Sequence, residues 1–165
     1  MATLFLICGL PGAGKTTLAR QIEQTHSAVR LSPDEWIVPI LADPTNIPER
    51  NRLRSPVEAL QWELCKRLLN LGQNVILEWG FWSRQERAQY RREAESLGAT
   101  VMLHYLSAAR DELWSRLSRR NAALPPGTFA VTEDELDEWW GWFEPPSDDE
   151  LAHQQAGSNA QTTQG

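Results

Sequence analysis

Short apolar runs alternate along the chain with longer segments in which apolar residues recur at helical spacing. The short runs predict strands at residues 4–8, 28–31, 74–78 and 100–106. Each is followed by a segment with the period of a helix, and crossovers of that length favour parallel pairing of the strands. We therefore predict a three-layer α/β fold, with a parallel sheet, helices on both faces and ligands bound beyond the carboxyl ends of the strands.

Capping signals place the starts of the helices. Ser32-Pro33-Asp34-Glu35 has the form of a short helix start, with Ser32 as the cap and Glu35 reaching back. Similar patterns begin helices at residues 55, 83 and 132, and two further helices are predicted from residues 17 and 107. The helix from residue 55 carries Leu60 and Leu71 among its core-facing positions. Residues 42–54 are polar and rich in proline and arginine, which predicts an irregular segment over the mouth of the site.

Composition limits the number of domains and the kinds of partner. A chain of 165 residues with 41% hydrophobic residues fits one domain, which we assign to residues 1–150. Residues 151–165 are rich in Gln, Ala, Ser, Thr and Asn, and we predict a disordered tail there. The net charge of −6 provides no overall positive field for nucleic acid or an anionic membrane. Nucleic acid is therefore a less favoured partner, although a local basic patch would keep it open.

Three further observations predict the cellular compartment. The two cysteines, Cys8 and Cys65, form neither a metal-ligand spacing nor a disulfide framework. Residues 1–10 lack the basic leader and the cleavage site of a signal peptide. The apolar runs are also shorter than the roughly 20 residues needed to span a bilayer. We expect a cytoplasmic protein without a membrane anchor, and no signal in the sequence indicates its oligomeric state.

The most specific motif follows the first predicted strand. Residues 9–16 read GLPGAGKT, which matches the G-x-x-x-x-G-K-T phosphate-binding loop between a strand and a helix. In such a loop the backbone N–H groups surround phosphates, Lys15 reaches the outer phosphates and the Thr16 hydroxyl binds Mg²⁺. The predicted nucleotide ligands are Gly9, Pro11, Gly12, Ala13, Gly14, Lys15, Thr16 and Thr17, and the predicted ligand is a nucleoside triphosphate, ATP.

Two carboxylates follow predicted strands at the same edge of the sheet. Asp34 follows the second strand, where it could accept the proton of an acceptor hydroxyl during phosphoryl transfer. The alternative is an acidic residue that only stabilises the first turn of its helix. Glu78 ends the third strand, where it could hold a Mg²⁺-bound water, or be a solvated carboxylate at a strand end.

A cluster of arginines precedes a proline-glycine turn. Arg116, Arg119 and Arg120 lie on the helix that starts near residue 107, and Pro125-Pro126-Gly127 follows them. Guanidinium groups offer paired donors to phosphate oxygens and keep their charge, so we predict a lid over about residues 116–131 that clamps the nucleotide. The alternative is a solvated helix face.

Several of the eight tryptophans lie near these motifs. Trp36, Trp79 and Trp82 fall beside the predicted base, the third-strand carboxylate and the turn after it, where they could line an acceptor pocket. Ordinary core packing is the alternative for these three. Trp139, Trp140 and Trp142 are predicted to be structural.

With these residues in view, the chain resembles the small AAA-type P-loop kinase family, which includes polynucleotide kinase domains, zeta-toxin-like kinases and chloramphenicol phosphotransferase. The resemblance covers about residues 2–150 and rests on four segments: GLPGAGKTT at 9–17, SPDEW at 32–36, ILEWGFWSRQER at 76–87 and RLSRRN at 116–121. It implies a core of five parallel strands, Asp34 as general base and lid arginines between Arg116 and Arg120 on the phosphates.

The sequence departs from this family in two places. Polynucleotide kinases carry an arginine shortly after the aspartate, whereas Ile37 and Val38 follow Trp36 here. Four strands are clear, but a fifth is not evident after Pro146, since the residues that follow are acidic and then polar. The first departure weakens the prediction of a nucleic-acid acceptor.

These observations predict an ATP-dependent kinase that transfers the γ-phosphoryl group to a hydroxyl of a small-molecule or nucleotide-like acceptor. Its predicted catalytic residues are Lys15, Asp34, Arg116 and Arg120, with Thr16 and Glu78 on Mg²⁺ and Arg119 on the nucleotide. The alternatives are an ATP-binding switch that acts through a protein partner and a 5′-hydroxyl polynucleotide kinase.

Overall fold

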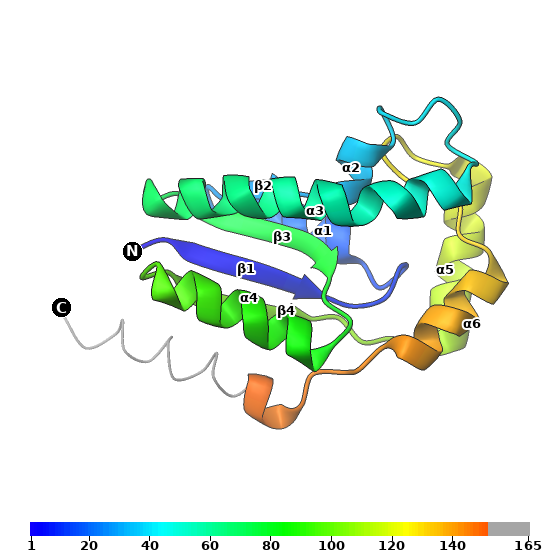
Figure 1. Ribbon diagram of the computed structural model, residues 1–165. Helices are drawn as coiled ribbons and strands as arrows, with labels where there is room; N and C mark the ends of the chain where they lie inside the picture. Colours follow the sequence, from blue (N-terminus) through cyan, green and yellow to red (C-terminus); the bar gives the residue numbers. More distant parts are fainter. Residues whose placement is uncertain (152–165) are drawn as a thin grey trace.

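The computed structural model describes residues 1–151 and contains a single parallel sheet (Figure 1). Its strands run in the order β2-β3-β1-β4, and every neighbouring pair is parallel. Their bounds are β1 Thr3–Cys8, β2 Val29–Leu31, β3 Val75–Gly80 and β4 Thr100–Tyr105. The predicted α/β fold and its four strands are confirmed.

Within residues 1–151 the sheet is accompanied by the helices α1 to α6, and Figure 1 shows where each lies. Helices α3 and α4 cover one face and α1 covers the other, while α2, α5 and α6 gather beyond the carboxyl ends of the strands. Their bounds are α1 Lys15–His26, α2 Pro33–Ile37, α3 Ile47–Asn70, α4 Arg84–Ser96, α5 Arg110–Ala123 and α6 Glu133–Trp142.

The end of the described chain contains a helical turn at residues 148–151, and residues 1–151 contain no fifth strand. The outer edge of β4 is therefore unpaired within this part of the chain. Apart from Leu151, the predicted tail lies outside the described residues. Among the described residues, no helix combines the length and the apolar content needed to cross a bilayer.

The core has two halves because side chains alternate across the central strand. Leu4, Leu6 and Cys8 of β1 pack toward α3 and α4, whereas Phe5 and Ile7 pack toward α1. All five are at most 1% exposed. A strand buried on both faces explains the continuous apolar run from which β1 was predicted.

The prediction of an irregular segment at residues 42–54 is wrong from residue 47 onward. Helix α3 begins at Ile47, with the Asn46 side chain accepting a hydrogen bond from the Glu49 N–H, and it continues through Pro56. The arginines of this segment lie on a helix and pair with carboxylates, as in the contact between Arg52 and Glu49. Polar composition indicated a loop because these pairs cannot be recognised from composition alone.

The register of α3 also differs from the prediction. Leu60 and Leu71, which we expected to face the core, are 63% and 82% exposed. The buried side chains below them are Val57, Trp62 and Leu69, together with Gln61 and Cys65. Trp62 lies among the buried side chains of α3, and its indole donates a hydrogen bond to Glu93 on α4 (2.8 Å).

The capping predictions have mixed outcomes. Thr132 and Glu135 form a reciprocal capping box, and the Ser83 hydroxyl accepts from the Glu86 N–H at 3.1 Å. Ser32 makes no side-chain cap at the start of α2. The Glu35 carboxylate, predicted to reach back to the helix start, pairs instead with Arg30 at 2.8 Å.

A buried ion pair fastens residues 144–150 to α4. The Arg87 side chain is 2% exposed, and its Nε and Nη2 donate to the two carboxylate oxygens of Glu150 at 2.7 and 3.1 Å. Its Nη1 donates to the carbonyls of Phe81 and Glu144, each at 2.9 Å. We call this arrangement the C-terminal latch. It connects the end of the described chain to the turn after β3.

The latch predicts a pH-dependent contribution to stability. The hydrogen bond from Arg87 lowers the pKa of Glu150 from its usual 4.5 to about 2. Because the pKa of this carboxyl is lower in the folded state, the ionised group stabilises the fold at any pH above its usual pKa of 4.5. This contribution is lost as the pH falls from about 4.5 to about 2. Glu150→Gln should lower the free energy of unfolding at pH 7 by about 2 kcal/mol, since the pair lies at the margin of the core.

Urea denaturation at pH 7 and at pH 3 measures this effect. The difference between the wild type and Glu150→Gln should shrink at the lower pH. Asp149→Asn is the matched control, because the Asp149 carboxylate pairs with Arg84 at the exposed surface. Equal losses in the two variants would contradict the buried latch.

Candidate functional site

The phosphate-binding loop lies between β1 and α1, at the carboxyl edge of the sheet. Gly12 and Gly14 have φ angles of 84° and 98°, which side chains rarely tolerate. A Cβ on Gly12 would also lie 3.0 Å from the Leu117 side chain and 3.1 Å from the Leu113 carbonyl. Glycine is thus required both for the turn and for close packing of α5 against the loop. The N-terminus of α1 follows directly, where helix N–H groups favour an anion.

Lys15 is the first residue of α1, and its ammonium is held inside the loop. The Nζ donates to the Leu10 carbonyl at 2.9 Å. Burial lowers the pKa of Lys15 from 10.5 to about 8, while the charges of Glu78 and Asp34 oppose this effect. The ammonium is therefore mostly charged at neutral pH and is poorly solvated, a condition that a bound anion would relieve.

The two predicted metal ligands lie in contact. The Thr16 hydroxyl donates a hydrogen bond to Glu78 Oε1, and Arg30 Nη1 donates to Glu78 Oε2 at 2.9 Å. Glu78 is 9% exposed although it is charged. Two oxygen groups from neighbouring elements therefore meet beside the loop, and hard oxygen donors are the type that Mg²⁺ prefers.

Asp34 lines the same cavity from the first turn of α2. Its Oδ1 accepts a hydrogen bond from Arg54 Nη1 at 3.0 Å. Arg54 comes from α3 and also donates to the Trp79 carbonyl (3.0 Å) and to Glu58 (2.5 Å). It therefore orients the Asp34 carboxylate and ties α2 and α3 to the end of β3.

Sequence reasoning missed Arg54 as a site residue. The arginine-rich composition of residues 42–54 was a signal of charge near the site. It did not identify Arg54, because the contact with Asp34 requires α3 to start at Ile47 and to carry residue 54 toward the cavity.

A cavity of about 730 Å³ joins these groups. It is bounded by the phosphate-binding loop, α2, α3, the end of β3 and residues 125–131. The predicted site residues that line it are Pro11, Gly12, Gly14, Lys15, Thr16, Thr17, Asp34, Glu78, Arg116 and Arg120. Gly9, Ala13 and Arg119 do not line it.

The three predicted lid arginines point to different partners. Arg116 Nη1 donates to the Gly12 carbonyl at 3.3 Å, and Arg120 Nη2 donates to the Phe129 carbonyl at 3.1 Å. Burial lowers the pKa of Arg120, and its Nε is buried without a partner among the described residues. Arg119 Nε donates back to the Ser115 carbonyl on its own helix. Two of the three thus face the cavity in this conformation.

The turn that follows α5 is packed against α2 and α3. Phe129 is buried in a cluster with Ile37, Leu41 and Val57, and the Arg50 guanidinium lies 5.2 Å from the centre of its ring. Arg50 also pairs with Glu135 of α6 at 2.6 Å. The segment predicted as a lid therefore closes one side of the cavity through a small apolar contact.

Aromatic side chains line the remaining wall. Trp79 and Trp82 line the cavity, whereas Trp36 does not. Trp139 and Trp142, which we predicted to be structural, also line it. The Trp82 and Trp139 rings are 5.5 Å apart, so α6 extends the aromatic wall as well as packing on the fold. The sequence could not show this, since the position of α6 depends on tertiary contacts.

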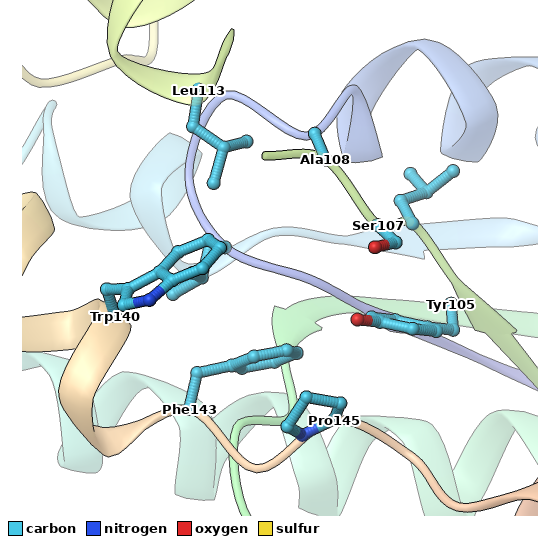
Figure 2. Close-up of a pocket in the computed structure, with 9 residues that line it drawn as sticks. Tyr105, Ser107, Ala108, Leu113, Trp140, Phe143 and Pro145 are labelled. Atoms are coloured by element: carbon cyan, nitrogen blue, oxygen red, sulfur yellow. The ribbon is translucent and has the colours of Figure 1, made fainter. Parts of the chain in front are cut away.

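A second cavity of about 170 Å³ lies between the end of β4 and α6, beside Leu10 (Figure 2). Figure 2 shows the rings of Tyr105, Phe143 and Trp140 around it, with Leu113 above and Pro145 below. Its wall is mainly apolar and contains no charged side chain, unlike the larger cavity. The larger cavity is therefore the one that can hold phosphates.

The buried ammonium of Lys15 predicts both the affinity and the pH dependence of nucleotide binding. Lys15→Met should weaken binding of ADP by about tenfold or more, because a charge-assisted contact to phosphate is lost. In the wild type, affinity should fall above about pH 8 as the free ammonium loses its proton. This part of the pH dependence should be absent in Lys15→Met.

Calorimetric titration with ADP at several pH values measures both effects. Lys66→Met is the matched control, because the only other lysine of the chain pairs with Glu63 at the surface of α3. Unchanged affinity in Lys15→Met would contradict the assignment of the loop as the phosphate site.

Comparison with known proteins gives a family match for most of the chain. A family model described as "AAA domain" matches residues 4–146. None of the curated proteins compared with the chain matches it significantly. The matched range contains the phosphate-binding loop, Asp34, Glu78 and the three arginines of α5.

Solved structures share the fold at low sequence identity. A candidate kinase from Chloroflexus aurantiacus aligns with a TM-score of 0.73 and 17% identity, covering 98% of this chain and 97% of that one. Kti12 from Chaetomium thermophilum, solved with ADP-AlF3, has a TM-score of 0.64, 18% identity and coverage of 98% and 100%. A gluconokinase from Sinorhizobium meliloti has a TM-score of 0.61, 17% identity and coverage of 96% and 93%. The chain is similar to all three in fold.

Proposed function

The chain belongs to the AAA domain family, and on that basis we propose that it is an ATP-dependent kinase acting on a hydroxyl group. The observation that carries the proposal is a carboxylate, Asp34, that lines the same cavity as the phosphate-binding loop and is held by Arg54. Phosphoryl transfer needs an oriented acceptor beside bound phosphates, and this pairing of groups supplies both requirements.

In the proposed reaction the loop N–H groups and Lys15 hold the nucleotide phosphates. Thr16 and Glu78 would hold Mg²⁺, which supplies positive charge to the phosphate oxygens when it is bound. The acceptor hydroxyl gives its proton to Asp34 as its oxygen bonds to the γ-phosphorus. The bond from that phosphorus to the β,γ-bridging oxygen breaks, and ADP leaves with the electron pair.

Arg116 and Arg120 are proposed to neutralise the charge that develops during transfer. Both line the cavity, and the Arg120 Nε is buried without a partner within residues 1–151, so a movement of this side chain would let it donate to a phosphate oxygen. Arg119 does not line the cavity here, and its predicted contact with the nucleotide would require a different side-chain position. The similarity in fold to a gluconokinase and to a protein solved with ADP-AlF3 is consistent with such chemistry.

The principal alternative is a nucleotide-dependent switch that hydrolyses ATP and acts through a protein partner. The packing of residues 125–129 on α2 and α3 favours it, because such a segment could signal the nucleotide state. The two functions differ in one measurable way. A kinase turns over ATP faster when its acceptor is present, whereas a switch does not depend on a small hydroxyl compound.

Replacing the proposed base separates binding from transfer. Asp34→Asn should lower kcat for phosphoryl transfer by roughly 10²–10⁴ while leaving the affinity for ADP nearly unchanged. The amide keeps the shape of the carboxylate but accepts a proton poorly. Transfer of labelled phosphate from γ-labelled ATP, measured beside calorimetric titration with ADP, provides both quantities.

Asp43→Asn is the matched control, because Asp43 is exposed and its carboxylate accepts hydrogen bonds from Thr45, outside the cavity. It should transfer phosphate at the wild-type rate. Normal transfer by Asp34→Asn would eliminate Asp34 as the base and would favour the switch.

A further inference from the structure

The larger cavity is lined by charged side chains of both signs. Lys15, Arg116 and Arg120 lie around the phosphate-binding loop, where a nucleotide is proposed to bind. Glu58 and Glu86 line the same cavity from α3 and α4, and Arg54 links Glu58 to the proposed base Asp34. An acceptor whose hydroxyl reaches Asp34 therefore lies beside Glu58 and Glu86, which would repel a negatively charged group on that acceptor.

Around Arg54 the carboxylates that line the cavity outnumber the cations. Asp34 and Glu58 share the single guanidinium of Arg54. Glu86 makes no ion pair within residues 1–151. The other arginine of α3 in the cavity, Arg50, is already paired with Glu135 at 2.6 Å. A positive charge on the acceptor would balance the excess negative charge of these carboxylates.

The surroundings of Glu86 disfavour the charged form of its carboxyl group. Burial raises its pKa above the usual value and the negative charge of Glu58 raises it further, while Arg54 and backbone hydrogen bonds at Ser83 and Trp82 only partly oppose them. A protonated amine between Glu58 and Glu86 would reverse this effect. The same two carboxylates would repel a carboxylate or phosphate on the acceptor.

The wall beside these carboxylates is rigid and aromatic. The Trp79 indole donates to Gln61 Oε1 at 2.9 Å and stacks on Phe81 at 5.7 Å. The Trp82 indole packs on Gly80, where an added Cβ would come within 2.8 Å of its Nε1. Fixed rings favour a flat or apolar part of a ligand, and they also attract a cation placed over their faces.

We propose that the phosphoryl acceptor is a hydroxylated small molecule with a protonated amine and an apolar or aromatic part, bound between Glu58, Glu86 and the Trp79–Trp82 wall. This inference rests on the proposed kinase function, because it takes Asp34 as the group that the hydroxyl must reach. It disfavours sugar acids and the 5′-hydroxyl ends of nucleic acids, since both carry negative charge near the reacting hydroxyl.

Three compounds of similar size and different charge test the inference. Phenylalaninol carries an amine, 3-phenyl-1-propanol is neutral and 3-phenyllactate carries a carboxylate, and each has one ring and one hydroxyl. Glucosamine, glucose and gluconate form a second series without the aromatic ring. A 5′-hydroxyl oligonucleotide is included as an anionic polymer. The measurements are transfer from γ-labelled ATP with Mg²⁺, and binding by ligand-observed NMR in the presence of ADP.

The expected result is at least a tenfold lower KM for the amine than for the neutral compound within a series, with no transfer to the anions. Glu86→Gln should raise the KM for the amine about tenfold and leave that of the neutral compound unchanged. This variant keeps every ion pair of Arg54 in place. Glu95→Gln is the matched control, because Glu95 is exposed on the same helix.

The failures of the two proposals can be told apart. Transfer to gluconate, phenyllactate or the oligonucleotide at least as efficiently as to the amines would overturn the inference and support the kinase function. Absence of transfer to every compound would count against the kinase function. The NMR measurement then decides the amine site, which is overturned if the amines bind no more tightly than the anions or if Glu86→Gln has no effect on their binding.

Discussion

The guanidinium of Arg54 is the contact on which the arrangement of the candidate site depends. It joins Asp34 of α2, Glu58 of its own helix and the backbone of β3 through hydrogen bonds of 3.0, 2.5 and 3.0 Å. Helices α2 and α3 also pack through Ile37 and Val57, and Arg54 adds a polar link from both helices to the end of β3. A planar group with several donors can satisfy a carboxylate and a carbonyl at once, which an ammonium would do with less directional control.

The position of residues 125–131 against the cavity depends on a second, weaker set of contacts. Phe129 enters an apolar cluster of α2 and α3, and Arg50 connects the ring to Glu135. The cluster is small in comparison with the two cores that hold the sheet. Local opening should therefore require far less free energy than unfolding, as is usual for segments that admit ligands. The rigid sheet edge and the weakly held turn have different roles in the same cavity.

Much of the fold and the nucleotide side of the site could be predicted from the sequence. The strands were visible because β1 and β3 are buried on both faces, and Lys15 and Thr16 were fixed by the spacing of one local motif. The acceptor side was less accessible. Arg54 reaches the cavity because α3 starts at Ile47, and Trp139 reaches it because α6 packs beside it. Both features depend on tertiary contacts, which the sequence pattern does not show. Asp34 was found because it directly follows a strand.

The C-terminal latch has a consequence for how this chain can be cut or joined to others. Arg87 spans Glu150 and the Phe81 carbonyl, and Phe81 itself lines the larger cavity. A protease that removed residues 144–150 would leave the buried Arg87 guanidinium without its carboxylate, at the carbonyl of Phe81, the residue before Trp82. In a shortened chain the wall of the larger cavity would therefore become disordered before the sheet unfolded. A fusion partner should accordingly be attached after the latch, with the last helical turn left intact.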